Sequence, residues 1–537
     1  MSKFTYHFLL PLFLAFHLGW SQTDIDVIKG VLIDDETKEP VVFATVRLKN
    51  MALGVISNYD GSFQIPDAFR LKDDTLVISS MGFETKEIDF SNLRTNSINT
   101  ITLRPSIFEL SETTVTAQKR RRVQKVRSGP SAEQIIARAI ERIPENYDEN
   151  SFDLVGYYRD YQLRQQQYTN LNEGLIRVFD QGFKVKDHTS LKFGLYDYQA
   201  NFDFEIDSFA AKPYDYKTND KYIPDAVFRQ YKIPNELALL LNHDAIRNNK
   251  ERTFSYVNTF VVDFIKEHDF TTYFLTNYGD RKVYKIKFKK DYTPFQVKGD
   301  IYIDTDTYAI RKIDYAVYRQ EPDGAFAEKY STSDMDLLYE ILVEYQKHRN
   351  HMYLNYISFH NQFKLTRPPA FFVKDVFIDK ITKQMTLVLN KPAANWLQLS
   401  TKDFRIYYKK MRLRVKEVVR VGDIGDTYAL SFSKKSKAQR SRIKQLISEE
   451  KDRQKASLEI IINTIADAQG NLLAQRKSEY IDQFREFFVQ QVIPGGIVLD
   501  DAQYVDKTIS LSDGQQPRLS LEIIEDMWMN TPLQNKQ

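Results

Sequence analysis

Between residues 284 and 363 the sequence alternates apolar and polar residues along several stretches, and this pattern restricts the fold more than any other feature. Side chains point alternately to the two faces of a strand, so each stretch predicts a strand with one apolar and one polar face. Several such strands in series predict an antiparallel meander that is wet on one side or curved around a groove. The alternating positions are Tyr284, Ile286 and Phe288 with Lys285, Lys287 and Lys289; Tyr339, Ile341, Val343 and Tyr345 with Glu340, Glu344 and Gln346; and Tyr353, Asn355, Ile357, Phe359 and Phe363 on one face.

Composition supports a mainly β protein of several domains. The 537 residues are too many for one core and suggest about two to four domains. The 32 Tyr and 36 Phe, against only 19 Gly, favour pleated and half-buried surfaces. A net charge of +3 gives no argument for nucleic acid as a partner. The absence of Cys excludes disulfides, thiolate metal sites, a cysteine nucleophile and a lipidated N-terminal Cys.

Residues 1–21 have the pattern of an export signal. Lys3 supplies the positive segment, Phe8 to Leu18 form the apolar segment, and Gly19 and Ser21 are the small residues of a cleavage site before Gln22. The apolar segment is too short for a membrane span, which needs about 20 residues. We therefore expect an exported protein of the periplasm or outer membrane, with a cleaved signal peptide and no covalent lipid.

Residues 22–105 predict a seven-stranded β-sandwich, because short strands are interrupted by turn residues such as Asp60-Gly61. We expect Gly61 to adopt a positive φ and this segment to fold on its own. The ordered motifs of this segment resemble the carboxypeptidase regulatory-like domain found in many exported proteins of the Bacteroidetes. They are Gly30-x-Leu32, Glu39-Pro40-Val41-x-Phe43-Ala44-x-Val46, Gly54-x-x-Ser57-Asn58-x-Asp60-Gly61-x-Phe63-x-Ile65 and Ser79-x-Met81-Gly82-Phe83. The resemblance implies a packing or docking module without a peptidase site.

Residues 106–130 form a basic linker. Its first part, Leu110 to Ala117, is similar to the joint that follows this domain in TonB-dependent receptors, but the chain shows no plug motif. The basic side chains indicate either a solvated hinge or a peripheral contact with anionic lipid headgroups. They are Lys119, Arg120, Arg121, Arg122, Lys125 and Arg127.

Residues 131–367 predict a helix followed by the antiparallel meander. Ser131 and Gln134 form a capping box, an apolar stripe from Ile135 to Ile143 follows, and Pro144 should end the helix. The stripe fits packing on the next sheet or, alternatively, a partner. A second helix is expected at Leu237 to Ile246, on the rim of the sheet. The run Ile135 to Arg159 resembles a group of uncharacterised Bacteroidetes proteins that share the N-terminal module.

The segment Tyr284 to Tyr318 looks like the curved sheets of periplasmic lipoprotein carriers. Its pattern is Gly299-x-Ile301-x-Ile303-Asp304-x-x-Thr307-x-x-Ile310. The resemblance implies a lipid or lipoprotein carrier as one hypothesis.

The remaining chain changes character after Pro368-Pro369. Residues 368–476 predict short strands with a charged helical insertion at 434–454. They form either an Ig-like β-domain or a continuation of the meander. The ending Asp467-x-x-Gly470-Asn471 is similar to bacterial Ig-like domains. Residues 477–537 predict an amphipathic helix over Tyr480 to Val489, with Phe484, Phe487 and Phe488 on one side, and a tail.

Three clusters could carry chemistry. His348, His351 and His360 could bind Zn²⁺, but alternation along a strand sets His351 and His360 on opposite faces. Asp300, Asp304 and Asp306 could attract Ca²⁺, although a hairpin turn explains them equally well. The group Tyr158-Arg159-Asp160-Tyr161 could bind carbohydrate through its rings or fill the pleat of a sheet. We therefore predict no catalytic, metal or cofactor residue.

Motif searches find no G-x-S-x-G elbow, no H-E-x-x-H and no phosphate-binding glycine loop. The favoured hypothesis is a non-catalytic exported envelope protein of β modules that binds a protein, glycan or lipid partner. The alternatives are a hydrolase of glycan or peptide whose carboxylates lie far apart in sequence, and the carrier.

Overall fold

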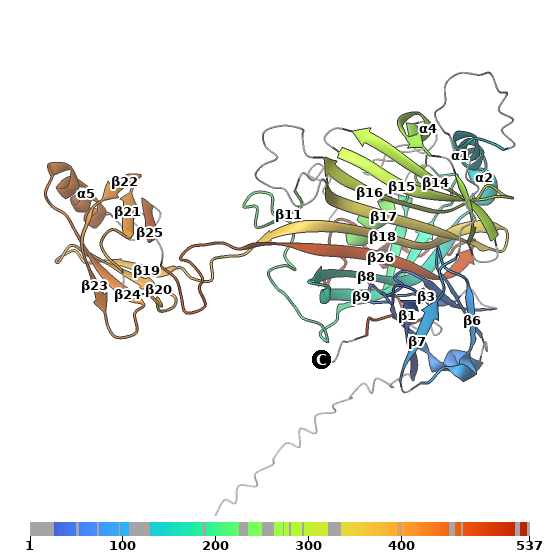
Figure 1. Ribbon diagram of the computed structural model, residues 1–537, viewed down its shortest axis with the longest axis horizontal. Coiled ribbons are helices and arrows are strands. Elements are labelled where there is room, and N and C mark those ends of the chain that lie inside the picture. The colour runs from blue at the N-terminus through green and yellow to red at the C-terminus, as the bar shows by residue number, and fades with distance from the viewer. Residues whose placement is uncertain are drawn as a thin grey trace, which may run out of the picture.

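A computed structural model describes most of the chain and shows a mainly β protein built around one large sheet (Figure 1). The described residues are 26–49, 53–71, 75–95, 97–106, 129–185, 190–224, 235–249, 263–271, 273–278, 281–292, 295–320, 335–395, 397, 399–449, 457–462, 465–520 and 527–533. The signal segment 1–21 and the basic side chains from Lys119 to Arg127 lie outside them.

The N-terminal module is a seven-stranded sandwich, as the sequence predicts. Its sheets have the orders β4-β1-β7 and β3-β2-β5-β6 and enclose one apolar cluster. Gly61 has φ +75° in the turn before β4, which confirms the expected positive φ. The strands are β1 (Val27–Asp34), β2 (Thr45–Leu48), β3 (Gly54–Ile56), β4 (Ser62–Pro66), β5 (Thr75–Ser79), β6 (Lys86–Asp89) and β7 (Ile98–Leu103).

The predicted meander is the centre of a 12-stranded sheet, whose main order is β10-β9-β8-β26-β18-β17-β16-β15-β14-β12. β11 also pairs with β18, and β13 with β14. The strands are β8 (Phe152–Arg164), β9 (Gln167–Asp180), β10 (Lys192–Ala200), β11 (Lys221–Tyr222), β12 (Asp269–Phe270), β13 (Phe274–Tyr278), β14 (Arg281–Tyr292), β15 (Phe295–Asp304), β16 (Ile310–Gln320), β17 (Met335–His348), β18 (His351–Thr366) and β26 (Ser478–Pro494).

Helices cover one face of this sheet, and their apolar side chains fill the core with Ile286, Ile301 and Val343. The predicted capping box is confirmed, because Gln134 N donates to Ser131 Oγ at 3.3 Å and Ser131 N donates to Gln134 Oε1 at 2.9 Å. The first helix ends at Glu141, shortly before Pro144 as predicted, and Pro144 itself lies in the first turn of the second helix. These helices are α1 (Ala132–Glu141), α2 (Ile143–Asn146), α3 (Glu236–Asn242) and α4 (Asp263–Glu267).

The prediction of a helix over Tyr480 to Val489 is wrong. The segment is β26, which pairs antiparallel with β18 on one side and with β8 on the other. Phe484, Phe487 and Phe488 are each at most 5% exposed, because a strand in the middle of a covered sheet is buried on both faces. Such a strand loses the alternation of a half-exposed strand and can imitate a helical spacing.

The segment between β18 and β26 forms a separate sandwich, with sheets β19-β20-β24-β23 and β22-β21-β25 around one core. We call it the inserted sandwich. Figure 1 shows it set apart from the large sheet, at the far end of β18 and β26. Its elements are β19 (Val373–Ile378), β20 (Gln384–Leu389), β21 (Phe404–Tyr408), β22 (Met411–Leu413), β23 (Val415–Val421), β24 (Thr427–Phe432), α5 (Lys437–Ser448) and β25 (Leu458–Ile462).

The tail residues 527–533 fasten the N-terminal module to the large sheet. Trp528 lies in the module's core cluster together with Tyr356 of β18 and Phe488 of β26. Its Nε1 donates to Gln64 O at 2.8 Å, and Gln490 of β26 donates to Trp528 O at 2.9 Å. Within the described residues, no helix has the length and apolar character needed to cross a membrane.

Candidate functional site

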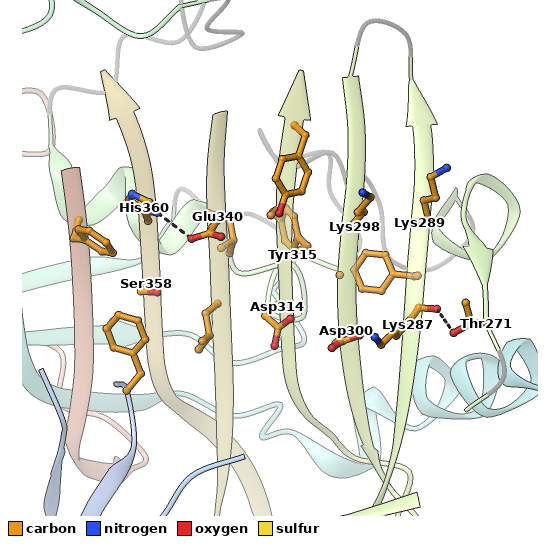
Figure 2. A pocket seen from close by; sticks show the side chains of 18 residues that line it. Thr271, Lys287, Lys289, Lys298, Asp300, Asp314, Tyr315, Glu340, Ser358 and His360 are labelled. Atoms are coloured by element: carbon orange, nitrogen blue, oxygen red, sulfur yellow. Dashed lines mark hydrogen bonds and ion pairs between the residues drawn. The ribbon is translucent and has the colours of Figure 1, made fainter. Parts of the chain in front are cut away.

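An open groove of about 580 Å³ lies on the face of the large sheet that the helices leave uncovered (Figure 2). The alternating strands build it: Ile286 and Phe288 point to the core, whereas Lys287 and Lys289 point to the groove. Phe43 of the N-terminal module and Phe484 of β26 also line it. The polar lining residues are Thr271, Lys287, Lys289, Lys298, Asp300, Asp314, Tyr318, Glu340, Ser358 and His360.

Each carboxylate that lines the groove has a cationic partner. Asp300 pairs with Lys285 at 2.9 Å, and Asp314 pairs with Lys312 at 3.2 Å. Glu340 Oε2 lies 2.9 Å from Nδ1 of His360. Because both partners in each pair stand on the same or a neighbouring strand, the groove presents charges whose positions are fixed by the sheet.

His360 is held as a cation. Glu340 and Asp482 accept from its two ring nitrogens at 2.9 and 2.8 Å, and its ring stacks on Phe484 at 4.2 Å with an interplanar angle of 5°. Burial disfavours the charge, but the hydrogen bonds with Asp482 and Glu340 outweigh it and raise the pKa of His360 to about 9. Both nitrogens are therefore occupied, and the ring cannot act as a metal ligand or general base at neutral pH.

The other two histidines lie elsewhere. His348 and His351 pair across the β17–β18 turn, and His360 follows nine residues later along β18. At about 3.3 Å per residue this is a separation of roughly 30 Å. The alternation argument that we used for His351 and His360 is not valid, since the β17–β18 register shifts between Glu344 and Tyr345. In the described part of the chain no three His, Asp or Glu side chains form a group able to hold a metal ion.

Of the three aspartates considered for Ca²⁺, Asp304 and Asp306 lie at a turn, whereas Asp300 lies within β15 and faces the groove. Asp304 Oδ1 accepts from the backbone N–H groups of Asp306 and Thr307 at 3.0 and 3.2 Å, and its Oδ2 pairs with Arg311 at 3.0 Å. Burial alone would raise the pKa of Asp304. These hydrogen bonds lower it by more, so the pKa of this carboxyl is below its usual range. This is the hairpin turn that joins β15 to β16.

The group at Tyr158 to Tyr161 cannot bind sugar through its rings, because Tyr158 and Tyr161 are fully buried. Tyr161 stacks on Phe484 at 5.1 Å. Arg159 forms an ion pair with Glu486 of β26 at 2.6 Å and a hydrogen bond with Asn58 of the N-terminal module. These side chains fill the pleat of the sheet and hold the module against it.

The sequence analysis identified the polar faces of β14 and β17 and gave a groove as one alternative for the meander, but it did not show which residues would line it. Asp482 and Phe484 were missed because their strand was predicted as a helix. Asp314 and Tyr318 were missed because alternation shows which face a residue takes but not which strands are neighbours. Phe43 was missed because its approach to this face depends on how the N-terminal module packs against the large sheet.

The comparison with protein families confirms the N-terminal module. The family model of the CarboxypepD_reg-like domain matches residues 28–115. This domain is a non-catalytic, Ig-like module. A comparison with curated proteins finds no match for the chain.

Proposed function

We propose that this chain is a non-catalytic exported protein of the cell envelope that binds a partner through the groove. The observation that carries the proposal is that two parts of the chain, the large sheet and Phe43 of the N-terminal module, line the groove together. Its three carboxylates and His360 are held in place by ion pairs, and such preorganised groups lose little conformational freedom when a ligand binds.

The groove does not favour hydrolysis. A glycoside hydrolase needs one carboxylic acid with a raised pKa as a proton donor. Burial would raise the pKa of Asp482, but the hydrogen bonds from His360 and Gln362 lower it below the usual range, so this group is a carboxylate. Burial does raise the pKa of Asp160, of Glu236 and of Asp244, the last to about 6, but none of the three lines the groove in the described structure, and Asp244 accepts a hydrogen bond from Tyr345 inside the core. It therefore stabilises the fold.

The carrier hypothesis is less well supported than binding in the groove. A carrier would hold an acyl chain against the apolar face of its curved sheet. Here side chains of α1 to α4 pack on that face, among them Ile136, Leu240 and Phe264. The groove on the opposite face is lined by apolar and charged side chains together, and the charged ones do not suit an acyl chain.

The proposal of export is based on residues 1–21. Association with the envelope would use either contacts with a partner protein or the basic linker. Fractionation of envelope membranes tests both routes. Release by a high-salt wash would support electrostatic contact through Lys119, Arg120, Arg121 and Arg122. Retention in salt with release by urea would support a protein-like contact, and extraction by detergent alone would contradict both.

A blocked groove tests the binding proposal. Ala316 lies in the groove, so Ala316→Trp should fill it and reduce binding of the purified protein to isolated envelopes. Ala429→Trp is the matched control, because Ala429 is likewise half-buried on a strand but belongs to the inserted sandwich. Equal binding by both folded variants would contradict the proposal.

A further inference from the structure

The groove has a positive charge that its own side chains do not balance. All three lining carboxylates, Asp300, Asp314 and Glu340, have cationic partners. Lys287 and Lys298 are exposed, and neither has an ion pair within the described ranges. The Lys298 ammonium instead lies 5.5 Å from the centre of the Tyr318 ring.

The unbalanced lysines are neighbours on one face. Lys298 of β15 is the direct register partner of Lys289 on β14. Lys287 lies two residues along β14, opposite Asp300, whose carboxylate forms its ion pair with Lys285. Side chains directly opposite each other in an antiparallel pair have Cβ atoms about 4.5–5.5 Å apart, and like charges in this position are destabilising. Lys289 reaches Asp291 at 2.8 Å, which offsets its charge only in part, since both side chains are about half exposed. An anion between these lysines would relieve the repulsion.

Ring faces accompany the lysines. Tyr318 and Phe43 line the same groove and are partly exposed. Phe484 also reaches the groove, but its ring stacks on His360 and Tyr161, so its faces are not open to a sugar. Aromatic faces stack on the apolar faces of sugar rings, while ammonium groups bind phosphate or carboxylate by charge-assisted hydrogen bonds. An acyl chain would leave the lysines unpaired, and a neutral glycan would not use them.

We infer that the groove binds an anionic saccharide, a glycan that carries phosphate or carboxylate groups. The anionic group is placed at Lys287, Lys289 and Lys298, and the sugar rings extend toward the aromatic side chains. This inference rests on the proposed function, since it names the class of ligand for the same groove.

Calorimetry with the mature chain, residues 22–537, tests the inference. The probes are an oligogalacturonate, which carries carboxylates, a phosphorylated mannan oligosaccharide, and neutral maltohexaose. We expect at least one anionic probe to bind and the neutral one not to bind, with an affinity that falls as salt rises. Which anionic probe binds decides between carboxylate and phosphate.

The variant Lys287→Gln/Lys298→Gln should weaken anion binding by about tenfold or more, because two charge-assisted contacts are lost. Lys416→Gln is the control, since Lys416 is an exposed lysine of the inserted sandwich. Equal binding of neutral and anionic probes, or an unaffected double variant, would overturn the inference and leave the proposed function in place. If no saccharide binds but Ala316→Trp still abolishes envelope binding, the ligand is of another class. If Ala316→Trp also has no effect, both proposals fail.

Discussion

The N-terminal module and the inserted sandwich have the same arrangement, a three-stranded and a four-stranded sheet around one core. Their attachment to the large sheet differs. The module shares its apolar cluster with Tyr356 and Phe488 of the large sheet and with Trp528 of the tail. The cluster of the inserted sandwich contains no residue of the large sheet.

The polar contacts show the same difference. Arg159 and Glu486, both 3% exposed in their side chains, lie under the module with Asn58. The inserted sandwich is joined through a stem where Arg367 pairs with Glu479 at 2.6 Å, and these side chains are about one third exposed. The comparison shows that one of two similar sandwiches can line a binding site while the other stays apart from it. The size and burial of the interface with the large sheet make the difference.

The largest effect is expected for Arg159→Ala. It leaves Glu486 buried without its ion-pair partner, which should cost about 3–5 kcal/mol in the free energy of unfolding. Arg164→Ala is the control on the same strand. Arg164 is about one third exposed and pairs with Glu205 at the surface, and its second partner Asp207 would keep its ion pair with Arg367, so the loss should be about 1 kcal/mol or less. Urea denaturation measures both, and equal losses would contradict a buried joint.

The second largest effect is expected for Trp528→Ala. It should lower the free energy of unfolding by about 3 kcal/mol, because it removes a ring that is only 7% exposed from the apolar cluster shared by the module and the large sheet. Amide hydrogen exchange should increase in β3 and β4 and stay unchanged in β19 to β25. Phe377→Ala in the inserted sandwich is the control, since Phe377 is 47% exposed. Unchanged exchange in the module would show that the tail does not fasten it.

Substitution of one glycine in each sandwich compares the two turns in which they lie. Gly61 and Gly470 both have positive φ, so Gly61→Val and Gly470→Val each introduce backbone strain of about 1–3 kcal/mol. A Cβ at Gly61 would also lie 2.6 Å from the Leu32 carbonyl oxygen, whereas nothing lies within 4 Å at Gly470. Thermal unfolding should therefore show the larger loss for Gly61→Val. A neutral Gly61→Val would be inconsistent with this turn.

The pH dependence should involve the large sheet and not the inserted sandwich. His360 has its pKa raised above the unfolded value of 6.5 to about 9, so its stabilisation is complete below pH 6.5 and is lost as pH rises through 9. The loss is on the order of 1–2 kcal/mol after allowance for partial exposure. His360→Gln should remove this contribution, measured as the difference from the unchanged protein in urea denaturation at pH 6 to 10, because Lys221, with its pKa lowered to about 7 by burial, titrates in both. His348→Gln should leave the contribution of His360 in place.

The smallest effect is expected when residues 371–473 are replaced by a short Gly-Ser linker. Ala474 N donates to Phe371 O at 2.8 Å, so the two ends of the inserted sandwich already meet. The melting temperature of the large sheet should change by no more than about 3 °C. Unfolding of the whole chain would show that the two parts depend on each other.

The sequence predicted what local patterns determine. The two faces of β14 and β17, the capping box at Ser131 and the turn at Gly61 follow from alternation, cap residues and turn residues. The place of β26 could not be predicted, because Phe484, Phe487 and Phe488 fit a helical period as well as a doubly buried strand. The sequence predicts only part of the groove lining. Lys287 and Glu340 fall on predicted polar faces, but which strands lie next to each other depends on the pairing of the whole sheet.

The position of β26 also has a consequence for the order of events in folding. Its ion pair with β8 joins residues 327 apart in the chain, so the contact closes a very long loop. The strands of β8 to β10 and of β14 to β18 can form hairpins early, but the two halves join only when residues 478–494 arrive. A chain that stops before them would leave β8 and one side of β18 as open edges, which are prone to aggregation. The sheet can therefore close only after residues 478–494 have been synthesised.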